Sequence, residues 1–184
     1  HLARDEDFEV RLFTTSIDRA TEFFGGNVEY AEGNVDDVES LKHAMDGCDF
    51  VYVNLKGGPS DEQYWQVEVE GSKNVYAAAK EVGIKKLVTI SEARADEKHS
   101  HFIMPRVKVE AAKALKESGL TYVILKPTWF CESLPLFLRQ NKAIYIGGGK
   151  TQFHFLACAE YAHIVAESFK SDKPNNKELT IFGP

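Results

Sequence analysis

The sequence predicts an α/β fold in which helices cover both faces of a doubly wound parallel sheet. Between residues 8 and 132, short apolar β-rich runs alternate with longer segments whose apolar residues have helical spacing. Runs that are apolar throughout, such as 50–53, are typical of strands covered on both faces. This alternation favours parallel strands joined by right-handed crossovers. In addition, no Gly-x-Gly-x-x-Gly turn stands before the first of these strands.

Length, charge and composition limit the class of protein. The chain has 184 residues, enough for one domain with a sizeable core, and its 43% hydrophobic content is ordinary for a soluble protein. A net charge of -6 argues against a nucleic-acid partner, and no apolar run approaches the roughly 18 residues that span a membrane. The three cysteines, Cys48, Cys131 and Cys158, are widely spaced, which favours reduced thiols in a cytoplasmic protein.

The periodicity also gives the order of the elements. The expected strands cover residues 8–13, 28–31, 50–53, 87–90, 122–125 and 179–182. The expected helices cover about 17–24, 61–82, 104–118 and 159–169, with a further helix that Asp36 caps, with Glu39 as its capping-box partner, and Gly47 ends. Residues 1–7 are interpreted as the tail of a helix, and 147–149 as a turn. We expect at least five strands in one parallel sheet, with four residues buried at its centre: Val10, Val51, Leu87 and Val123.

The organisation is predicted to be a single domain over residues 1–184. The alternating pattern loosens after Pro127, and no internal repeat or interdomain linker is visible. From about residue 128 we therefore expect a small substrate-covering part that is attached to the sheet.

Several linked segments resemble one known family. Residues 69–75, 77–80 and 83–91 resemble the middle of the extended and atypical short-chain dehydrogenase/reductases, and residues 119–130 resemble their NmrA-like branch. The chain has Lys126-Pro127 where that branch usually has Arg-Pro. The resemblance implies a Rossmann-like NAD(P)-binding domain that lacks the family's first strand and Gly-rich turn, and the part after Pro184.

In the family fold, the first strand lies in the middle of the sheet. A gap at that place would expose two long hydrogen-bonding edges. We therefore expect the 184-residue chain alone to fold poorly and to bind neither NAD nor NADPH tightly. Truncation, proteolysis, an incomplete record and completion by another chain all remain open as explanations.

The resemblance also implies the catalytic positions. The family's Tyr-x-x-x-Lys pair matches Met104 and Lys108, so the proton-donating tyrosine is missing while Lys108 is suited to hold the nicotinamide ribose. Ser91 matches the family's Ser/Thr position at a strand end. The alternative for Lys108 is an ordinary solvated helix lysine.

Two turns are expected to hold the adenosine end of the cofactor. Asn34 and Val35 follow the second strand, where the family flanks the adenine, although Gly33-Asn34 also suits a plain turn. Thr15, Ser16 and Arg19 follow the first strand and have the chemistry to hold a 2′-phosphate; an ordinary helix N-cap at Ser16 is the equal alternative. The absence of a repelling carboxylate there favours NADP over NAD.

The remaining site residues follow later strands. Asn54, Leu55 and Lys56 lie at the sheet edge where ligands bind in such folds, and are expected to border the ribose and nicotinamide. The resemblance places Pro127 and Thr128 beside the nicotinamide. The expected substrate pocket comprises Met104, Trp129 and Phe130, with ordinary core packing as the alternative for the two aromatic residues.

These observations give two main functions. The first is an NAD(P)H-dependent reductase of a small carbonyl, quinone or similar acceptor. The second is a non-catalytic redox sensor that binds NAD(P) and reports to a protein partner, and an inactive scaffold is a third possibility. A homo-oligomer is compatible with each. The spacing of His99 and His101, with no neighbouring carboxylate or thiol ligand, favours solvated side chains over a metal site.

Overall fold

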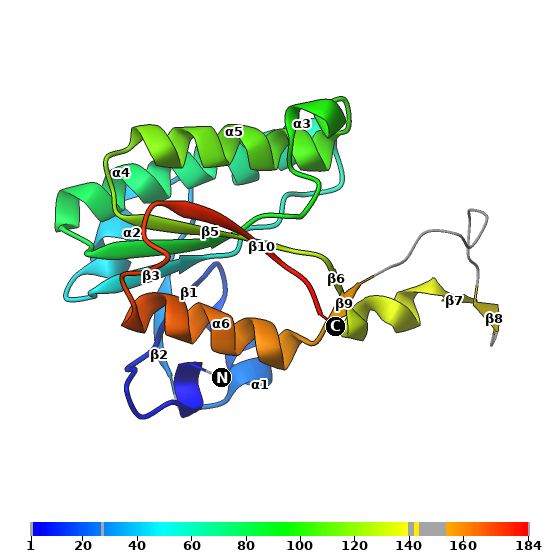
Figure 1. Cartoon of the computed structure of the whole chain (residues 1–184). Helices are drawn as coiled ribbons and strands as arrows, with labels where there is room; N and C mark the ends of the chain where they lie inside the picture. Colours follow the sequence, from blue (N-terminus) through cyan, green and yellow to red (C-terminus); the bar gives the residue numbers. More distant parts are fainter. Residues whose placement is uncertain (1, 27, 140–141, 144–153, 184) are drawn as a thin grey trace.

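The computed structural model describes residues 2–26, 28–139, 142–143 and 154–183 (Figure 1). The predicted turn at 147–149 lies outside these residues. The described chain folds as an α/β sandwich, with helices α4 (Ser72–Val82) and α5 (Ile103–Glu117) on one face of a parallel sheet and α6 (Cys158–Lys170) on the other (Figure 1). No helix in these residues is long and apolar enough to cross a membrane.

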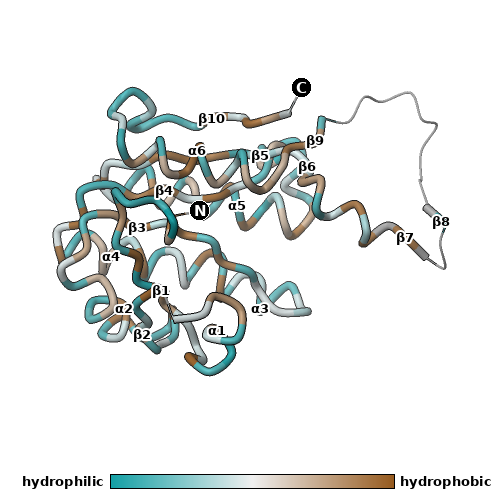
Figure 2. The backbone as a smooth tube through the Cα atoms, turned by 90° about the horizontal axis from the view of Figure 1, so that it is seen from below, coloured by the Kyte–Doolittle hydropathy of each residue, from teal (hydrophilic) through white to brown (hydrophobic). Residues whose placement is uncertain are grey.

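The central sheet has four parallel strands in the order β10-β5-β4-β3. Their bounds are β3 (Phe50–Val53), β4 (Lys86–Ile90), β5 (Tyr122–Pro127) and β10 (Lys177–Ile181). Leu87 and Val123 are fully buried at the centre, as predicted. The apolar stretches along β5 and α6 are visible in Figure 2, and they meet in a core cluster with Val88, Leu125 and Val165.

The expectation of one sheet with at least five strands is wrong. The strands β1 (Arg11–Thr14) and β2 (Glu29–Glu32) form a separate parallel pair, and β1 is not hydrogen-bonded to β3 in the described chain. Strands β1 and β3 each have a ladder neighbour on one side alone. Val51, on β3, is only half-buried. Val10 is also half-buried, because it precedes β1 and does not lie in the central sheet.

Side chains and helices connect the β1-β2 pair to the rest of the molecule. One guanidinium nitrogen of Arg11 donates to the carbonyl oxygens of Ala44 (2.9 Å) and Asp46 (2.7 Å), at the end of α2. On the other side, Phe8 packs on Phe169 of α6 with 6.1 Å between ring centroids. The pair is therefore held by packing and capping contacts where a continuous ladder is absent.

The helices follow the predicted periodicity with two corrections. Their bounds are α1 (Ile17–Phe24), α2 (Val38–Met45), α3 (Asp61–Trp65), α4 (Ser72–Val82), α5 (Ile103–Glu117) and α6 (Cys158–Lys170). The N-cap of α2 is Asp37, not Asp36, because the Asp37 carboxylate accepts from the backbone of Glu39 and Ser40. The predicted single helix 61–82 is interrupted by a π-helix, η2 (Gln66–Gly71), between α3 and α4.

Short elements complete the fold. They are the 3₁₀ helices η1 (Leu2–Arg4), η3 (Glu97–His99) and η4 (Cys131–Phe137), and the two-residue strands β6 (Trp129–Phe130), β7 (Leu138–Arg139), β8 (Lys142–Ala143) and β9 (Phe155–Leu156). The parallel pairing of β6 with β9 joins the segment after Thr128 to the start of α6.

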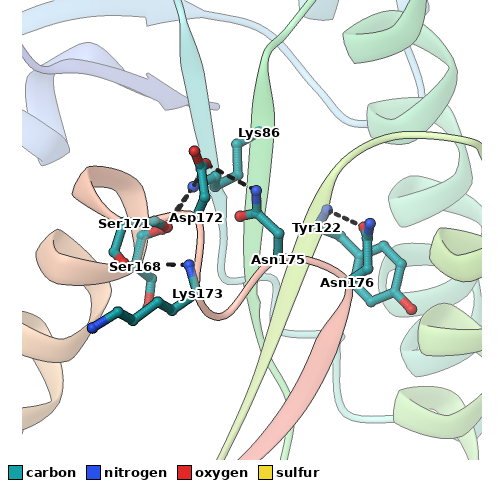
Figure 3. Close-up of polar contacts among 8 residues, drawn as sticks. All are labelled: Lys86, Tyr122, Ser168, Ser171, Asp172, Lys173, Asn175 and Asn176. Carbon is teal, nitrogen blue, oxygen red and sulfur yellow. Dashed lines mark hydrogen bonds and ion pairs between the residues drawn. The ribbon is translucent and has the colours of Figure 1, made fainter.

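A buried lysine anchors the end of α6 beneath the sheet (Figure 3). Lys86, with 5% of its side chain exposed, donates to the carbonyl oxygens of Ser168 (3.2 Å) and Ser171 (2.8 Å). Those carbonyls belong to the last turn of α6, which has no intrahelical donors left for them. Its ammonium also lies 3.4 Å from the exposed carboxylate of Asp172. Lys86 therefore caps α6 and fixes it against β4.

Lys86→Ala should destabilise the protein by about 1–3 kcal/mol, because it leaves buried carbonyl oxygens without donors. Lys85→Ala is the matched control: Lys85 is 70% exposed and pairs with Asp49 on the surface. The control should cost less than about 1 kcal/mol. Urea unfolding of both variants measures the difference, and equal losses would contradict the capping role.

Candidate functional site

A small polar pocket lies at the carboxyl ends of β3 and β4, beneath η2 and α5. Its cavity volume is about 10 Å³, which is room for one water molecule. The polar residues that line it are Glu68, Ser72, Tyr76, Thr89, Ser91 and Lys108. The structure thus brings Ser91 and Lys108, both expected site residues, into one pocket from separate elements, and Leu55 also lines this pocket.

Lys108 is held by a carboxylate that the sequence analysis missed. Its ammonium lies 2.5 Å from Oε2 of Glu68, and the two side chains are 16% and 5% exposed. The alternative of a solvated helix lysine is therefore wrong. One signal was present in the sequence: Glu68 lies four residues before Ser72 and eight before Tyr76, so helical spacing places its carboxylate on the same face as these two residues, which are buried.

Further ionisable groups surround this ion pair. Burial raises the pKa of the half-buried Glu92 carboxyl, which follows Ser91; Lys108 opposes that shift and Glu68 adds to it. Burial also raises the pKa of Tyr76 to about 12, so its hydroxyl keeps its proton at neutral pH. The site therefore holds one ammonium among two carboxyl groups and neutral hydroxyls.

An open cavity of about 290 Å³ lies at the carboxyl end of β1 and the start of α1. It is lined by Thr15, Ser16 and Arg19, the residues predicted to meet a 2′-phosphate. The Ser16 hydroxyl accepts from the backbone of Arg19 at 3.4 Å, so Ser16 is also the N-cap of α1. The structure thus shows the capping role, and phosphate binding remains a prediction.

The two residues of the predicted adenine turn differ in their exposure to solvent. Asn34 is exposed, and its side-chain oxygen accepts from the backbone of Asp36 at 3.2 Å. Val35 is 9% exposed and packs in the main core cluster. A Cβ atom on Gly71 of η2 would lie only 2.7 Å from its side chain, so this turn and the π-helix are in close contact.

The residues expected near the nicotinamide follow β5 and β3. Pro127 is buried, and its carbonyl oxygen accepts from the backbone of Ala93 at 3.1 Å. The hydroxyl oxygen of Thr128 is buried and has no hydrogen-bond partner among the described residues. A buried polar atom of this kind requires a partner, which a bound ligand can supply. Asn54 and Lys56 are exposed after β3.

The three predicted substrate-pocket residues have different surroundings. Met104 and Trp129 are each 49% exposed, at the start of α5 and on β6. Phe130 packs edge-on against Tyr161 of α6, with 5.3 Å between ring centroids. The core alternative therefore describes Phe130, while Met104 and Trp129 are accessible from solvent.

The comparison with known families decides the identity of this fold. A family model described as NAD(P)H-binding matches residues 1–144. The chain belongs to this NAD(P)H-binding family. The match, together with the parallel sheet, confirms the Rossmann-like fold and the family resemblance predicted from the sequence.

Known proteins similar to this NAD(P)H-binding chain include three curated relatives and many solved structures. Photosystem II assembly factor Ycf39 of Cyanophora paradoxa is 25% identical over 186 residues, covering 98% of this chain and 58% of that protein. The NADPH-dependent quinone oxidoreductase QOR2 of Escherichia coli, solved with NADPH, has a TM-score of 0.73 at 21% identity, covering 94% of this chain and 59% of that one.

A second similar structure was solved with NAD instead of NADPH. The Bordetella bronchiseptica enzyme WbmG, solved with NAD, has a TM-score of 0.71 at 18% identity, covering 95% of this chain and 64% of that one. At these identities the two structures show the fold alone. The chain spans less than two thirds of the length of each of the three proteins.

Thr128→Val tests whether the buried hydroxyl has a ligand-binding role. The change removes an unpaired polar atom with little change of volume, so the free protein should gain up to about 1 kcal/mol of stability. NADPH binding, followed by fluorescence titration, should weaken about 5-fold or more if the hydroxyl bonds the cofactor. A gain of stability with unchanged affinity would remove Thr128 from the site.

Proposed function

We propose that this chain is the cofactor-binding part of an NAD(P)H-dependent reductase that acts on a quinone, a small carbonyl or a similar acceptor. The observation that supports this most directly is the shared pocket of Ser91 and Lys108 at the carboxyl ends of β3 and β4. Ligands bind at this edge in open parallel sheets. The chain spans only part of the length of its relatives, so the reductase activity is proposed for the whole protein.

The described residues fit a dinucleotide at two places. The unpaired Thr128 hydroxyl and the Lys108 ammonium would hold the nicotinamide ribose end. The cavity beside β1 would hold the adenosine phosphate through Thr15, Ser16 and Arg19, with Asn34 near the adenine. None of the residues that line that cavity carries a carboxylate, which favours NADP over NAD. When bound, NADPH supplies the hydride.

The residue at position 104 favours one class of acceptor. Met104 cannot donate a proton, so a simple carbonyl would have to become an alkoxide, whose basicity approaches that of hydroxide. A quinone instead becomes a phenolate-like anion, comparable to tyrosine with a pKa of about 10. Such an anion needs no acid in the site, so a quinone fits these residues better than an aldehyde or ketone.

We also propose a cellular compartment and a class of partner for this protein. All three cysteines are free thiols, as expected in the reducing cytoplasm. The partner of the reductase is a small-molecule acceptor, and neither a nucleic acid nor a membrane is required. Two copies of the chain are compatible with this function.

A redox sensor is the second candidate. Met104 supports it, because the position of the family's proton donor is occupied by a side chain with no acid-base chemistry. A sensor would bind NADPH and a protein partner but would not oxidise the cofactor in the presence of acceptors. The two functions are therefore distinguished by turnover.

NADPH oxidation by the full-length protein, followed at 340 nm, tests this assignment. With a benzoquinone the rate should exceed the rate with a benzaldehyde by about 10-fold or more, since only the aldehyde needs an acid worth that factor or more. Binding without oxidation of NADPH by any acceptor would favour the sensor. An aldehyde preference would contradict the role given to Met104.

Lys108→Ala should weaken NADPH binding about 10- to 100-fold, because a charge-assisted hydrogen bond contributes about 1.5–3 kcal/mol. Lys113→Ala, an exposed lysine on the same helix, is the matched control and should leave the affinity unchanged. Calorimetric titration measures both variants. Equal affinities of the two would show that Lys108 does not contact the cofactor.

A further inference from the structure

Glu68 has no role in the function proposed above, yet it is the group that Lys108 contacts most closely. We propose that Glu68 is the positioning residue of this site: its carboxylate holds the Lys108 ammonium in place and directs it at the space beside Ser91. This inference rests on the proposed binding of an NAD(P) ribose at Lys108. It adds a residue that the family resemblance did not indicate.

The first argument is the cost of the ion pair. Glu68 is 4% exposed, and burial of a carboxylate is expensive unless a cation compensates it. Among the described residues, Lys108 is the one cation paired with it. An apolar pair of similar volume is often at least as stable as a buried ion pair, so stability alone does not account for the charges. Orientation of the lysine does account for them.

The second argument is the geometry of η2. Glu68 lies within the π-helix, whose wider turn changes the direction of its side chains relative to a continuous α-helix. Single π-turns inside α-helices are frequent at functional sites. Glu70, two residues later, faces away and pairs with Lys73, at 38% exposure. The two glutamates of one short helix thus serve different surfaces.

The third argument is the support behind η2. Gly71 lies so close to Val35 that an added Cβ would approach its side chain to 2.7 Å. The amide of Asn74, in the first turn of α4, donates to the Val35 carbonyl at 2.9 Å. The position of Glu68 is therefore coupled to the turn that is expected to meet the adenine. The residues expected to bind the two ends of one cofactor would therefore both contact η2.

The donors of Lys108 complete the argument. An ammonium has three N–H groups, and Glu68 accepts from one of them. The others are left for hydroxyl groups such as those of a ribose. The further titratable groups around this ion pair are Tyr76 on α4, and Glu92, Arg94 and His99 after β4. None of these is hydrogen-bonded to Lys108 in the described chain.

Chemical labelling of Lys108 tests the proposal without requiring enzyme activity. The Glu68 carboxylate occupies the Lys108 amine, so loss of this ion pair should leave the amine more open to an acylating reagent. In the full-length protein, we expect Glu68→Gln to increase acylation of Lys108 by N-hydroxysuccinimidyl acetate at pH 8 by about 10-fold, quantified by mass spectrometry. NADPH should protect Lys108 in the wild-type protein and protect it much less in the variant.

Glu70→Gln is the matched control, because it removes the other ion pair of η2, and it should leave the labelling of Lys108 unchanged. Unchanged labelling in Glu68→Gln would overturn the proposal, whatever the turnover of the wild-type protein. Increased labelling in a protein that oxidises no NADPH would support the positioning role and reject the reductase. Glu68→Met provides a second, apolar replacement; if neither variant folds, Glu68 is a structural residue and the proposal fails.

Discussion

Parallel pairing of β3, β4 and β5 is the constraint on which the candidate site depends. A parallel ladder places the carboxyl ends of its strands at one edge, so residues far apart in the chain meet there without any local motif. Ser91 follows β4, Leu55 follows β3 and Thr128 follows β5. The helix α5 lies on one face of the sheet and adds Lys108 to the same pocket. Any change of strand register would separate these side chains.

Two buried lysines show how differently this fold uses the same residue type. Lys86 lies at the amino end of β4, and its ammonium is bonded to carbonyl oxygens at the end of α6, which makes it a cap. Lys108 lies at the opposite edge, and its ammonium is bonded to one carboxylate beside a small polar cavity. The first has its donors taken by the backbone. The second has one carboxylate partner among the described residues, and the proposed function assigns its remaining donors to a ligand.

The break between the two sheets has a similar physical basis. The gap expected where the family has its first strand lies between β1 and β3, which share no ladder in the described chain. Arg11 and the packing of Phe8 on Phe169 provide contacts that a ladder would otherwise give. Interactions of this kind fix the two parts through side chains, which leaves backbone groups at both strand edges without ladder partners.

The sequence by itself determined the elements, because periodicity and stop signals are local. The apolar run 50–53 and the helical spacing over 17–24 and 104–118 predicted elements that the structure contains. The family resemblance also indicated Ser91 and Lys108 as site residues, and the structure brings both to one pocket. What only the tertiary structure decided depends on contacts between distant segments. The π-helix that directs Glu68 inward packs on Val35, and Phe130 packs edge-on against Tyr161 of α6. No local pattern encodes these, because each arises from the shape of a neighbour that the chain reaches only on folding.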